Sequence, residues 1–232
     1  MYWNQRDMSS HSANEHWERY KTMDTTNALH GKKLAFIGCG TMGEAILATL
    51  LNNNMVTADQ ISGSEPVVER REDLSRRYGI HMTGSNAEAV QDADLIMLTI
   101  KPQSLESIAK DLRGKLNPEQ VVVSILAGAT VASITSGLDH QAVVRAMPNT
   151  PSQIGQGMTV WMATPQVSDS QQVEVAAALS AIGFRYGVRA VERIVERAPA
   201  RVGCVQRIAR VGSRHDELRA RHASDLVIDV AG

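Results

Sequence analysis

A glycine-rich loop near residue 40 has the residue types that a dinucleotide diphosphate requires. The loop reads Gly38-Cys39-Gly40-Thr41-Met42-Gly43. Gly38 permits a tight turn, Gly40 lets the main chain approach a phosphate because it has no Cβ atom, and Gly43 allows close packing of helix on strand. Free N–H groups at the start of the helix then face the anion. We therefore expect all six residues to bind a nicotinamide dinucleotide.

The flanking segments decide whether this pattern is a binding loop or a glycine turn that binds nothing. Such a short pattern also occurs by chance, so its context matters. The apolar run Leu34–Ile37 precedes the loop, and a polar stop follows at residues 52–54. Between them, an apolar stripe has the i, i+3, i+4, i+7, i+8 spacing of one helical face: Met42, Ala45, Ile46, Thr49 and Leu50. The order strand, loop, helix favours nucleotide binding.

The composition indicates a globular protein and argues against several function classes. The chain has 232 residues, 43% of them hydrophobic, with a net charge of -1. A nucleic-acid-binding protein would normally carry a basic excess, and no apolar run approaches the roughly 20 residues of a membrane span. Cys39 and Cys204 lack the spacing of a disulfide framework or a zinc site. We expect a cytoplasmic protein with no metal, nucleic-acid or membrane partner.

Further apolar runs alternate with amphipathic stretches along residues 31–184. Continuous runs of four to six apolar residues suit strands that are covered on both faces of a parallel sheet. Further strands are predicted at residues 60–64, 95–100, 121–126, 142–146 and 157–162, and helices at residues 66–77, 105–112 and 168–182. This pattern predicts a doubly wound (Rossmann) α/β domain, with a mostly parallel sheet and helices on both faces.

Ligands of open α/β sheets bind beyond the carboxyl ends of the strands, so the residues that close each strand are site candidates. Besides the glycine loop, small or exposed backbone groups occur at residues 127–129 and 147–150. Lys101 is either a ligand of a phosphate or ribose, or a solvent-facing lysine. The cofactor candidates from these closures are Thr99, Ile100, Lys101, Pro102, Ala127, Gly128 and Asn149.

Four segments together resemble the pyrroline-5-carboxylate reductase family, in its order and spacing. They are residues 36–43, 100–102, 123–128 and 145–151. The resemblance covers residues 31 to about 184 and implies NAD(P)H-dependent reduction of 1-pyrroline-5-carboxylate to L-proline. It also implies that Asn86 and residues 99–102 help to hold the cofactor. A related reductase of another small imine or hydroxy acid fits the residues at 147–151 less well.

The end of the second predicted strand governs the choice between NADP and NAD. Glu65 stands about where an acidic side chain would bind the ribose hydroxyls of NAD. Ser64, Arg70 and Arg71 favour a 2′-phosphate instead, although both arginines also suit a solvated charged helix. Because the family commonly uses NADP, we expect NADPH to be preferred and NADH to be accepted.

No side chain is assigned a catalytic role, because a protonated imine needs little acid–base assistance and positioning supplies most of the rate. We expect His81 and His140 to lie at the ends of elements or on the surface, and His11 and His16 to be solvated residues of a polar extension over residues 1–30.

Residues 185–232 form a segment of different character, with ten arginines and no lysine. They are interpreted as a solvated, poorly packed tail in preference to a basic interaction tail. In the family that the chain resembles, a helical domain that forms homo-oligomers and completes the substrate site follows at this point. Its signatures are not found, which suggests a shifted reading frame or a truncated gene. We therefore expect impaired reductase activity, with a non-catalytic NAD(P)-binding module as the alternative.

Overall fold

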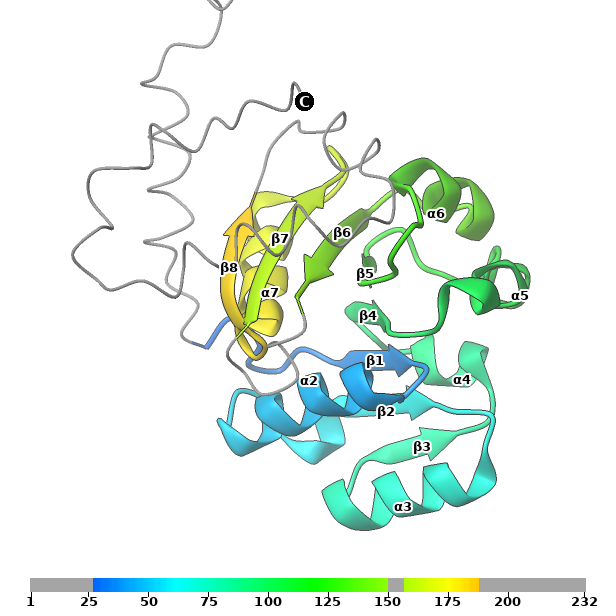
Figure 1. Cartoon of the computed structure of the whole chain (residues 1–232), viewed down its shortest axis with the longest axis vertical. Helices are drawn as coiled ribbons and strands as arrows, with labels where there is room; N and C mark the ends of the chain where they lie inside the picture. Colours follow the sequence, from blue (N-terminus) through cyan, green and yellow to red (C-terminus); the bar gives the residue numbers. More distant parts are fainter. Residues whose placement is uncertain (1–26, 150–156, 188–232) are drawn as a thin grey trace, which may run out of the picture.

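The computed structural model describes residues 27–149 and 157–187, which form one domain around a central eight-stranded sheet (Figure 1). The strands are β1 Leu34–Ile37, β2 Ile61–Ser64, β3 His81–Thr83, β4 Leu95–Leu98, β5 Val121–Ser124, β6 Val143–Pro148, β7 Gly157–Ala163 and β8 Gly183–Gly187. The helices are α2 Thr41–Asn52, α3 Val68–Tyr78, α4 Asn86–Val90, α5 Leu105–Leu112, α6 Val131–Leu138 and α7 Asp169–Ser180. Two short 3₁₀ turns lie at Ala58–Gln60 and Pro102–Ser104.

The strand order β3-β2-β1-β4-β5-β6-β7-β8 confirms the prediction of a doubly wound, mostly parallel sheet. Every neighbouring pair from β3 to β6 is parallel, β7 runs antiparallel to β6, and β8 is parallel to β7. The chain moves outward from β1 to β3 and then returns to the other side of β1 at β4. The carboxyl ends of β1 and β4 therefore form the switch point at which open α/β sheets bind ligands.

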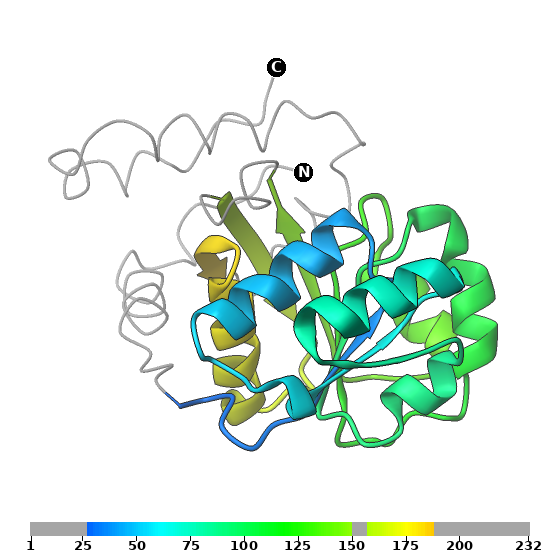
Figure 2. The same cartoon turned by 90° about the horizontal axis from the view of Figure 1, so that it is seen from below.

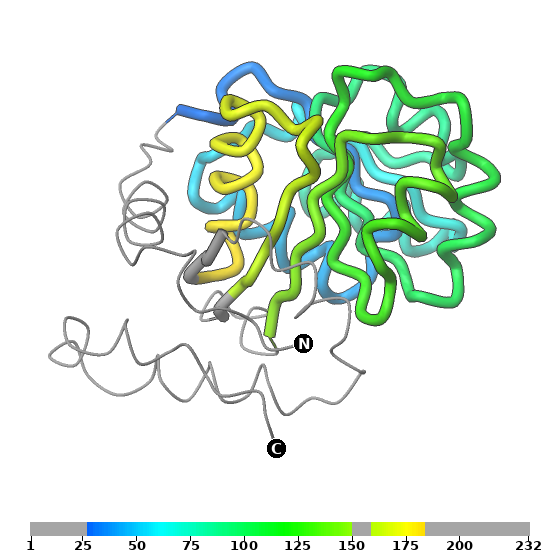
Figure 3. The backbone as a smooth tube through the Cα atoms, turned by 90° about the horizontal axis from the view of Figure 1, so that it is seen from above, coloured from blue at the N-terminus to red at the C-terminus, as the bar shows by residue number. Residues whose placement is uncertain are grey.

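Alternate strand residues pack on opposite faces of the sheet, which explains why the strands read as continuous apolar runs. Phe36 and Met97 belong to a core that includes residues of α2, α3 and α7. Ile37 and Leu98 belong to a second core, formed with α4, α5 and α6. Figure 2 shows α2 and α3 running side by side, and Figure 3 shows the strands between the gold helix α7 and the green helices.

The predicted helix boundaries follow from local capping chemistry. Ser168 caps α7, since its hydroxyl accepts a hydrogen bond from Gln171 N while the Gln171 side chain reaches back to the Ser168 amide. Gly79 ends α3 in the left-handed conformation, at φ 70°. These ends agree with the predicted helices at residues 66–77 and 168–182 to within two residues, with α3 beginning at Val68 rather than at residue 66.

The sequence pattern missed or misplaced several elements because tertiary pairing defines them. The strands β3 and β8 and the helices α4 and α6 are too short or too polar to give a clear period. The strands β4 and β5 each end two residues earlier than predicted, at Leu98 and Ser124. In contrast, β6 extends two residues further, to Pro148, because it pairs with β7.

The domain boundaries remain predictions. The structure shows contacts close to both of them. Leu29 is buried in the first core, and Gln60 Nε2 donates hydrogen bonds to Leu29 O (3.0 Å) and Lys32 O (2.7 Å). At the other end, β8 continues in register with β7 as far as residue 187. Residues 1–26 of the predicted extension, and residues 188–232 of the arginine-rich segment, lie outside the described residues. Within the described part, none of the helices could cross a membrane.

Candidate functional site

The glycine loop leaves β1 between β2 and β4, at the switch point of the sheet. Its first amide, Gly38 N, donates a hydrogen bond to Ser64 O (3.0 Å) at the end of β2. On the other side, Thr99 N donates to Ile37 O (3.0 Å). The loop is thereby held by backbone hydrogen bonds to both neighbouring strands, and the start of α2 is fixed above the carboxyl edge of the sheet.

Gly38 and Gly43 have no room for a side chain. Gly38 has φ +79°, and a Cβ atom there would lie 2.7 Å from Ile100 Cγ2 and 3.2 Å from Ile100 Cα. A Cβ atom at Gly43 would lie 2.7 Å from Thr99 Oγ1 and 2.8 Å from Gly38 O. The Thr99 hydroxyl itself donates a hydrogen bond to Gly38 O. These two glycines therefore allow the loop, α2 and the end of β4 to pack against one another.

Gly40 differs from its neighbours because the space around it is open. It is the N-cap of α2, and no atom lies within 4 Å of the position that a Cβ atom would occupy. Glu44 N donates to Gly40 O (2.9 Å), which closes the first helical turn. The amides at the start of that turn have no partner within the helix and point out of its end. A helix start with an open glycine is suited to binding a phosphate.

Cys39 lies in the loop but its thiol faces the protein interior. The side chain is fully buried, and its backbone N–H donates to Glu65 Oε2 (3.2 Å). Burial, together with the charge of Glu65, raises the pKa of the thiol to about 12, so it is un-ionised at neutral pH. Cys39 can therefore contribute only backbone groups to a ligand.

A chain of hydrogen bonds links the end of β2 to α4 and α5. Ser64 Oγ donates to Asn86 Oδ1 (2.6 Å), and Asn86 Nδ2 donates to Asp111 Oδ2 (2.9 Å). Asp111 also accepts from Lys115 Nζ (3.0 Å), and the bonds from Asn86 and Lys115 lower the pKa of its carboxyl. The structure thus brings together Ser64 and Asn86, which are 22 positions apart in the sequence. Asp111 fixes the orientation of the amide, and no sequence pattern pointed to it.

Arg70 and Arg71, in the first half of α3, bind protein groups rather than projecting freely into solvent. Arg71 Nη1 donates to Glu65 O (2.7 Å) and Pro66 O (3.0 Å), which fixes the turn between β2 and α3. Arg70 contacts Glu44 and the carbonyl oxygen of Cys39. Glu65 uses its second carboxylate oxygen to accept from Val67 N (3.4 Å).

The remaining candidates lie along the carboxyl edge of the sheet, after β4, β5 and β6. Thr99, Ile100 and Asn149 are partly buried, Thr99 through its contact with the glycine loop. The exposed members are Lys101, Pro102, Ala127 and Gly128. Gly128 has φ +78° with open space around it. The signature residues from Thr150 onward, up to residue 156, lie outside the described part of the chain.

Val67 and Val68 are a feature of this edge that the sequence analysis missed. Their side chains are 51% and 49% exposed, and they are the exposed large hydrophobic side chains of the described residues. They stand at the start of α3, directly after the end of β2. Adjacent exposed apolar residues beside a candidate site offer a surface for a flat apolar ring. The signal in the sequence was an apolar pair inside an otherwise charged helix.

The two histidines expected at element ends have different environments. His81 begins β3 and is exposed, with Nε2 3.3 Å from Glu88 Oε1. His140 lies just after the end of α6, which agrees with the first of the two predicted alternatives, an element end. It is buried, with Nε2 2.7 Å from Gln120 O, so the second alternative, a surface position, does not apply. Both contacts are structural and lie away from the glycine loop. Among the described residues, no group of three histidine, cysteine or acidic side chains could hold a metal ion.

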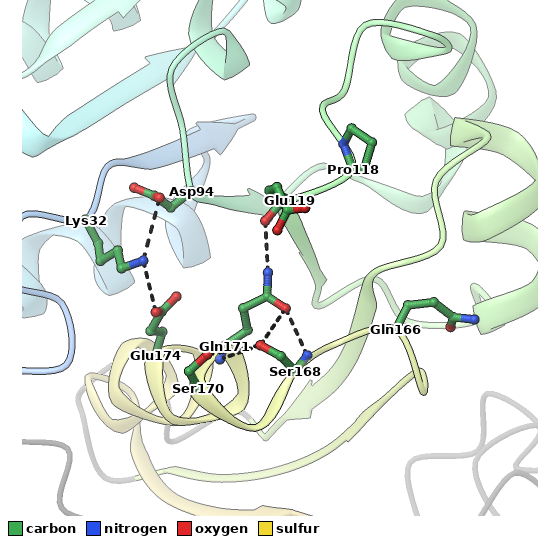
Figure 4. Close-up of a pocket in the computed structure, with 9 residues that line it drawn as sticks. All are labelled: Lys32, Asp94, Pro118, Glu119, Gln166, Ser168, Ser170, Gln171 and Glu174. Atoms are coloured by element: carbon green, nitrogen blue, oxygen red, sulfur yellow. Dashed lines mark hydrogen bonds and ion pairs between the residues drawn. The ribbon is translucent and has the colours of Figure 1, made fainter.

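A pocket of about 370 Å³ lies at the opposite end of the sheet (Figure 4). It lies where the amino ends of β1, β4 and β5 meet the first turns of α7. Lys32 Nζ is 3.0 Å from Glu174 Oε1 and 3.7 Å from Asp94 Oδ1, and Gln171 Nε2 donates to Glu119 O (2.9 Å). Because these groups bind one another and face the amino edge, the pocket joins α7 to the sheet and is separate from the nucleotide edge.

Comparison with known proteins identifies the relatives of this domain. Residues 33–128 match the family described as NADP oxidoreductase, coenzyme F420-dependent. A pyrroline-5-carboxylate reductase from Pseudomonas aeruginosa is 40% identical over 153 residues, which are 66% of this chain and 56% of that protein. One from Synechocystis is 37% identical over 151 residues, 65% of this chain and 56% of that protein. The chain thus spans little more than half the length of these relatives.

Solved structures show the same architecture. A pyrroline-5-carboxylate reductase from Coxiella burnetii superposes with a TM-score of 0.67 at 27% identity, covering 70% of this chain and 61% of that one. A Plasmodium falciparum pyrroline carboxylate reductase with NADP bound gives a TM-score of 0.60 at 21% identity, over 68% of this chain and 58% of that one. The second likeness supports the fold alone.

The glycine geometry predicts which loop substitutions destabilise the domain. Gly43→Ala should lower the unfolding free energy by about 1–3 kcal/mol, because its Cβ would overlap Thr99 Oγ1 and Gly38 O. Gly40→Ala should change it by less than about 0.5 kcal/mol, because the space is open. Urea unfolding of the two variants and the wild type measures both effects. Equal stability of the two variants would contradict this account of the loop.

The ion pair in the amino-edge pocket predicts a pH-dependent contribution to stability. The hydrogen bond and charge of Glu174 raise the pKa of Lys32 in the folded state. Glu174→Gln should therefore cost about 0.5–1 kcal/mol below the ordinary lysine pKa of about 10.4. That cost should disappear as the pH rises through the higher, folded pKa.

Urea unfolding of the wild type and Glu174→Gln at pH 8 and pH 11 measures this difference. Lys33→Gln is the control, because Lys33 forms only an exposed pair with Asp92, at 3.6 Å. A Glu174→Gln effect of the same size at both pH values would show that the pair does not act through the charge of Lys32.

Proposed function

We propose that the described domain is a member of the pyrroline-5-carboxylate reductase family and binds NADPH across the carboxyl ends of β1, β2, β4 and β5. The observation that carries this proposal is the loop geometry. Gly38 and Gly43 are packed against the end of β4 while Gly40 is left open at the helix start. The match at residues 33–128 and the 40% identity over 153 residues support the proposed family.

Each part of the edge suits a different part of the dinucleotide. The loop of Gly38, Cys39, Gly40, Thr41, Met42 and Gly43 lines the diphosphate position. Because Gly38 N and Cys39 N already donate to Ser64 O and Glu65, the donors for the diphosphate come from the first turn of α2. Ser64 and Asn86 lie at the end of β2, where the adenosine ribose of such cofactors is bound. The nicotinamide half then passes the tips of β4, β5 and β6, along Thr99, Ile100, Lys101, Pro102, Ala127, Gly128 and Asn149.

The contacts of Glu65 support a preference for NADPH, with NADH accepted. The Glu65 carboxylate accepts hydrogen bonds from Cys39 N and Val67 N, so it is already held by the backbone on two sides. The Ser64 hydroxyl and the Asn86 amide are neutral groups at the same strand end. The Ser64 hydroxyl donates to Asn86 and one Asn86 N–H donates to Asp111, so the second Asn86 N–H is the donor for a phosphate oxygen. A neutral amide N–H binds a phosphate without the repulsion that a carboxylate directed at it would cause. Val67 and Val68 provide apolar surface for the adenine ring.

We further propose that the protein is a cytoplasmic oxidoreductase of proline synthesis, which reduces 1-pyrroline-5-carboxylate to L-proline. Bound NADPH would supply the hydride that adds to the C=N carbon of the protonated imine. The residues of this domain orient the nicotinamide and exclude water from one side of it. Holding two reactants in the correct geometry can lower a barrier by about 7–11 kcal/mol, so no acid or base from these strands is required.

Nucleotide titration of the purified chain tests the proposal. Nicotinamide fluorescence should show saturable NADPH binding, and Gly40→Ala should weaken it at least about tenfold, because a Cβ at the helix start blocks the phosphate. The 1-pyrroline-5-carboxylate is then added and the loss of nicotinamide absorbance is followed.

The two steps of this experiment separate the binding proposal from the activity proposal. Imine-dependent oxidation of NADPH would support the reductase activity. Saturable binding without oxidation would show that the chain is a nucleotide-binding module that does not catalyse the reduction. A folded wild type that ignores both NADPH and NADH at millimolar concentration would contradict the proposal as a whole.

The polar pair at the end of β2 makes a second prediction. Asn86→Ala should weaken NADPH binding about tenfold and NADH binding much less, because the lost amide faces the position of the 2′-phosphate. Titration with both nucleotides measures the ratio of the two affinities. Ser62→Ala is the matched control, since Ser62 lies on the same strand and its hydroxyl donates to Ala89 O (2.6 Å), away from the edge. A change in this ratio for Ser62→Ala, or equal losses of both nucleotides for Asn86→Ala, would contradict the assignment.

A further inference from the structure

A partly buried cluster of charges lies beside the glycine loop, between α2 and α3. Glu44 of α2 forms an ion pair with Arg70 of α3. Its other oxygen forms an ion pair with Arg77 Nη1 (2.7 Å) and accepts a hydrogen bond from Tyr78 Oη (2.8 Å). The Glu44 side chain is 18% exposed and the Arg70 side chain 30% exposed. Asp73 adds a second carboxylate, 3.7 Å from Arg70 Nη1.

Glu44 is ionised in this environment. Burial by itself would raise its pKa, but the hydrogen bonds from Arg70 and Tyr78 and the charges of Arg70 and Arg77 together lower the pKa below its ordinary value. Its position in the first turn of α2 favours a negative charge as well. Arg70 is therefore paired within the protein with Glu44 and Asp73, two carboxylates that it shares with Arg77 and Arg76.

Arg70 reaches the loop as well as the carboxylate. Its Nε and Nη2 atoms donate to Cys39 O at 3.4 Å and 3.2 Å. The N–H of the same residue, Cys39, is held by the Glu65 carboxylate. Both polar backbone groups of Cys39 are thus bound by residues of the turn after β2 and of α3.

Because the peptide group is planar, the contact of Arg70 with Cys39 O also fixes the direction of the Gly40 N–H. In a trans peptide the C=O of one residue and the N–H of the next point in opposite directions. Because Arg70 holds Cys39 O on the α3 side, the Gly40 N–H points away from α3. Gly40 is the open N-cap of α2, so its amide is a donor at the proposed diphosphate position.

We propose that Arg70, held by Glu44, is a positioning residue that orients the Gly40 amide toward the diphosphate, and is not a ligand of the 2′-phosphate. This inference rests on the proposed nucleotide-binding function. The role differs from both that the sequence left open for Arg70, a 2′-phosphate ligand or a solvated residue of a charged helix. A diphosphate is common to NADPH and NADH, whereas a 2′-phosphate is present only in NADPH. The effect of removing the guanidinium must therefore be the same for both nucleotides.

Titration of Arg70→Ala with NADPH and with NADH tests the inference. We expect both dissociation constants to rise by a similar factor, about tenfold, so that their ratio stays at the wild-type value. Arg70→Lys should not restore binding, because a single ammonium cannot contact both Glu44 and Cys39 O with the fork of a guanidinium. Arg76→Ala is the matched control on the same helix, since its side chain is 74% exposed and pairs only with Asp73.

A double-substitution cycle tests whether Glu44 acts through Arg70. Glu44→Gln should weaken both nucleotides about threefold, and adding it to Arg70→Ala should cause no further loss. Thermal unfolding of each variant is measured alongside, because a purely structural role would lower the melting temperature and leave the dissociation constants unchanged well below it.

The outcomes separate failure of this inference from failure of the proposed function. A loss confined to NADPH would make Arg70 a phosphate ligand and overturn the inference while supporting the proposed function. Unchanged affinities for both nucleotides in folded Arg70→Ala would overturn it as well. A wild type that binds neither nucleotide would instead refute the proposed function on which the inference depends.

Discussion

The close approach of the glycine loop to the end of β4 is the contact on which the site depends. Gly38 and Gly43 lie so near to Ile100 and Thr99 that a single methyl group at either position would overlap them. This packing fixes the start of α2 at the switch point of the sheet, between β2 and β4. Without it, the amides of the first helical turn would not be aligned over the carboxyl edge. The open space at Gly40 is useful only because its two neighbours are tightly packed.

Two networks of polar side chains lie on either side of the glycine loop. On one side, Ser64, Asn86 and Asp111 form a hydrogen-bonded chain from β2 to α5. On the other side, Glu44 and Arg70 join α2 to α3 and hold a loop carbonyl. In both chains most groups bind protein partners, which stabilises one orientation of each side chain. The edge is therefore organised before any ligand arrives.

The two ends of the sheet differ in what their charged groups do. At the amino edge, Lys32 forms ion pairs with Asp94 and Glu174 across a pocket, and these connect α7 to the sheet. At the carboxyl edge, backbone amides, small residues and exposed apolar side chains face outward instead. Charges that pair with one another across a cavity hold two elements together. Backbone N–H groups without a partner in the helix, at the switch point of a sheet, can instead bind a ligand.

The sequence alone determined the elements whose apolar period or end signals are strong. These include β1, α2 and the start of α7, and the glycine spacing predicted the loop. It did not predict β3, α6 or β8, because short strands and a short helix are defined by the partners they pack against. Nor did it indicate that His140 is buried.

The roles of individual polar side chains were decided only by the tertiary structure. Spacing placed Glu65, Arg70 and Arg71 near the end of β2, but it could not show which groups they bind. The fold directs Glu65 to the Cys39 amide, Arg70 to Glu44 and the loop carbonyl, and Arg71 to the turn after β2. Hydrogen bonds act over about 3 Å and depend on direction, so they are fixed by how helices pack and not by distance along the chain.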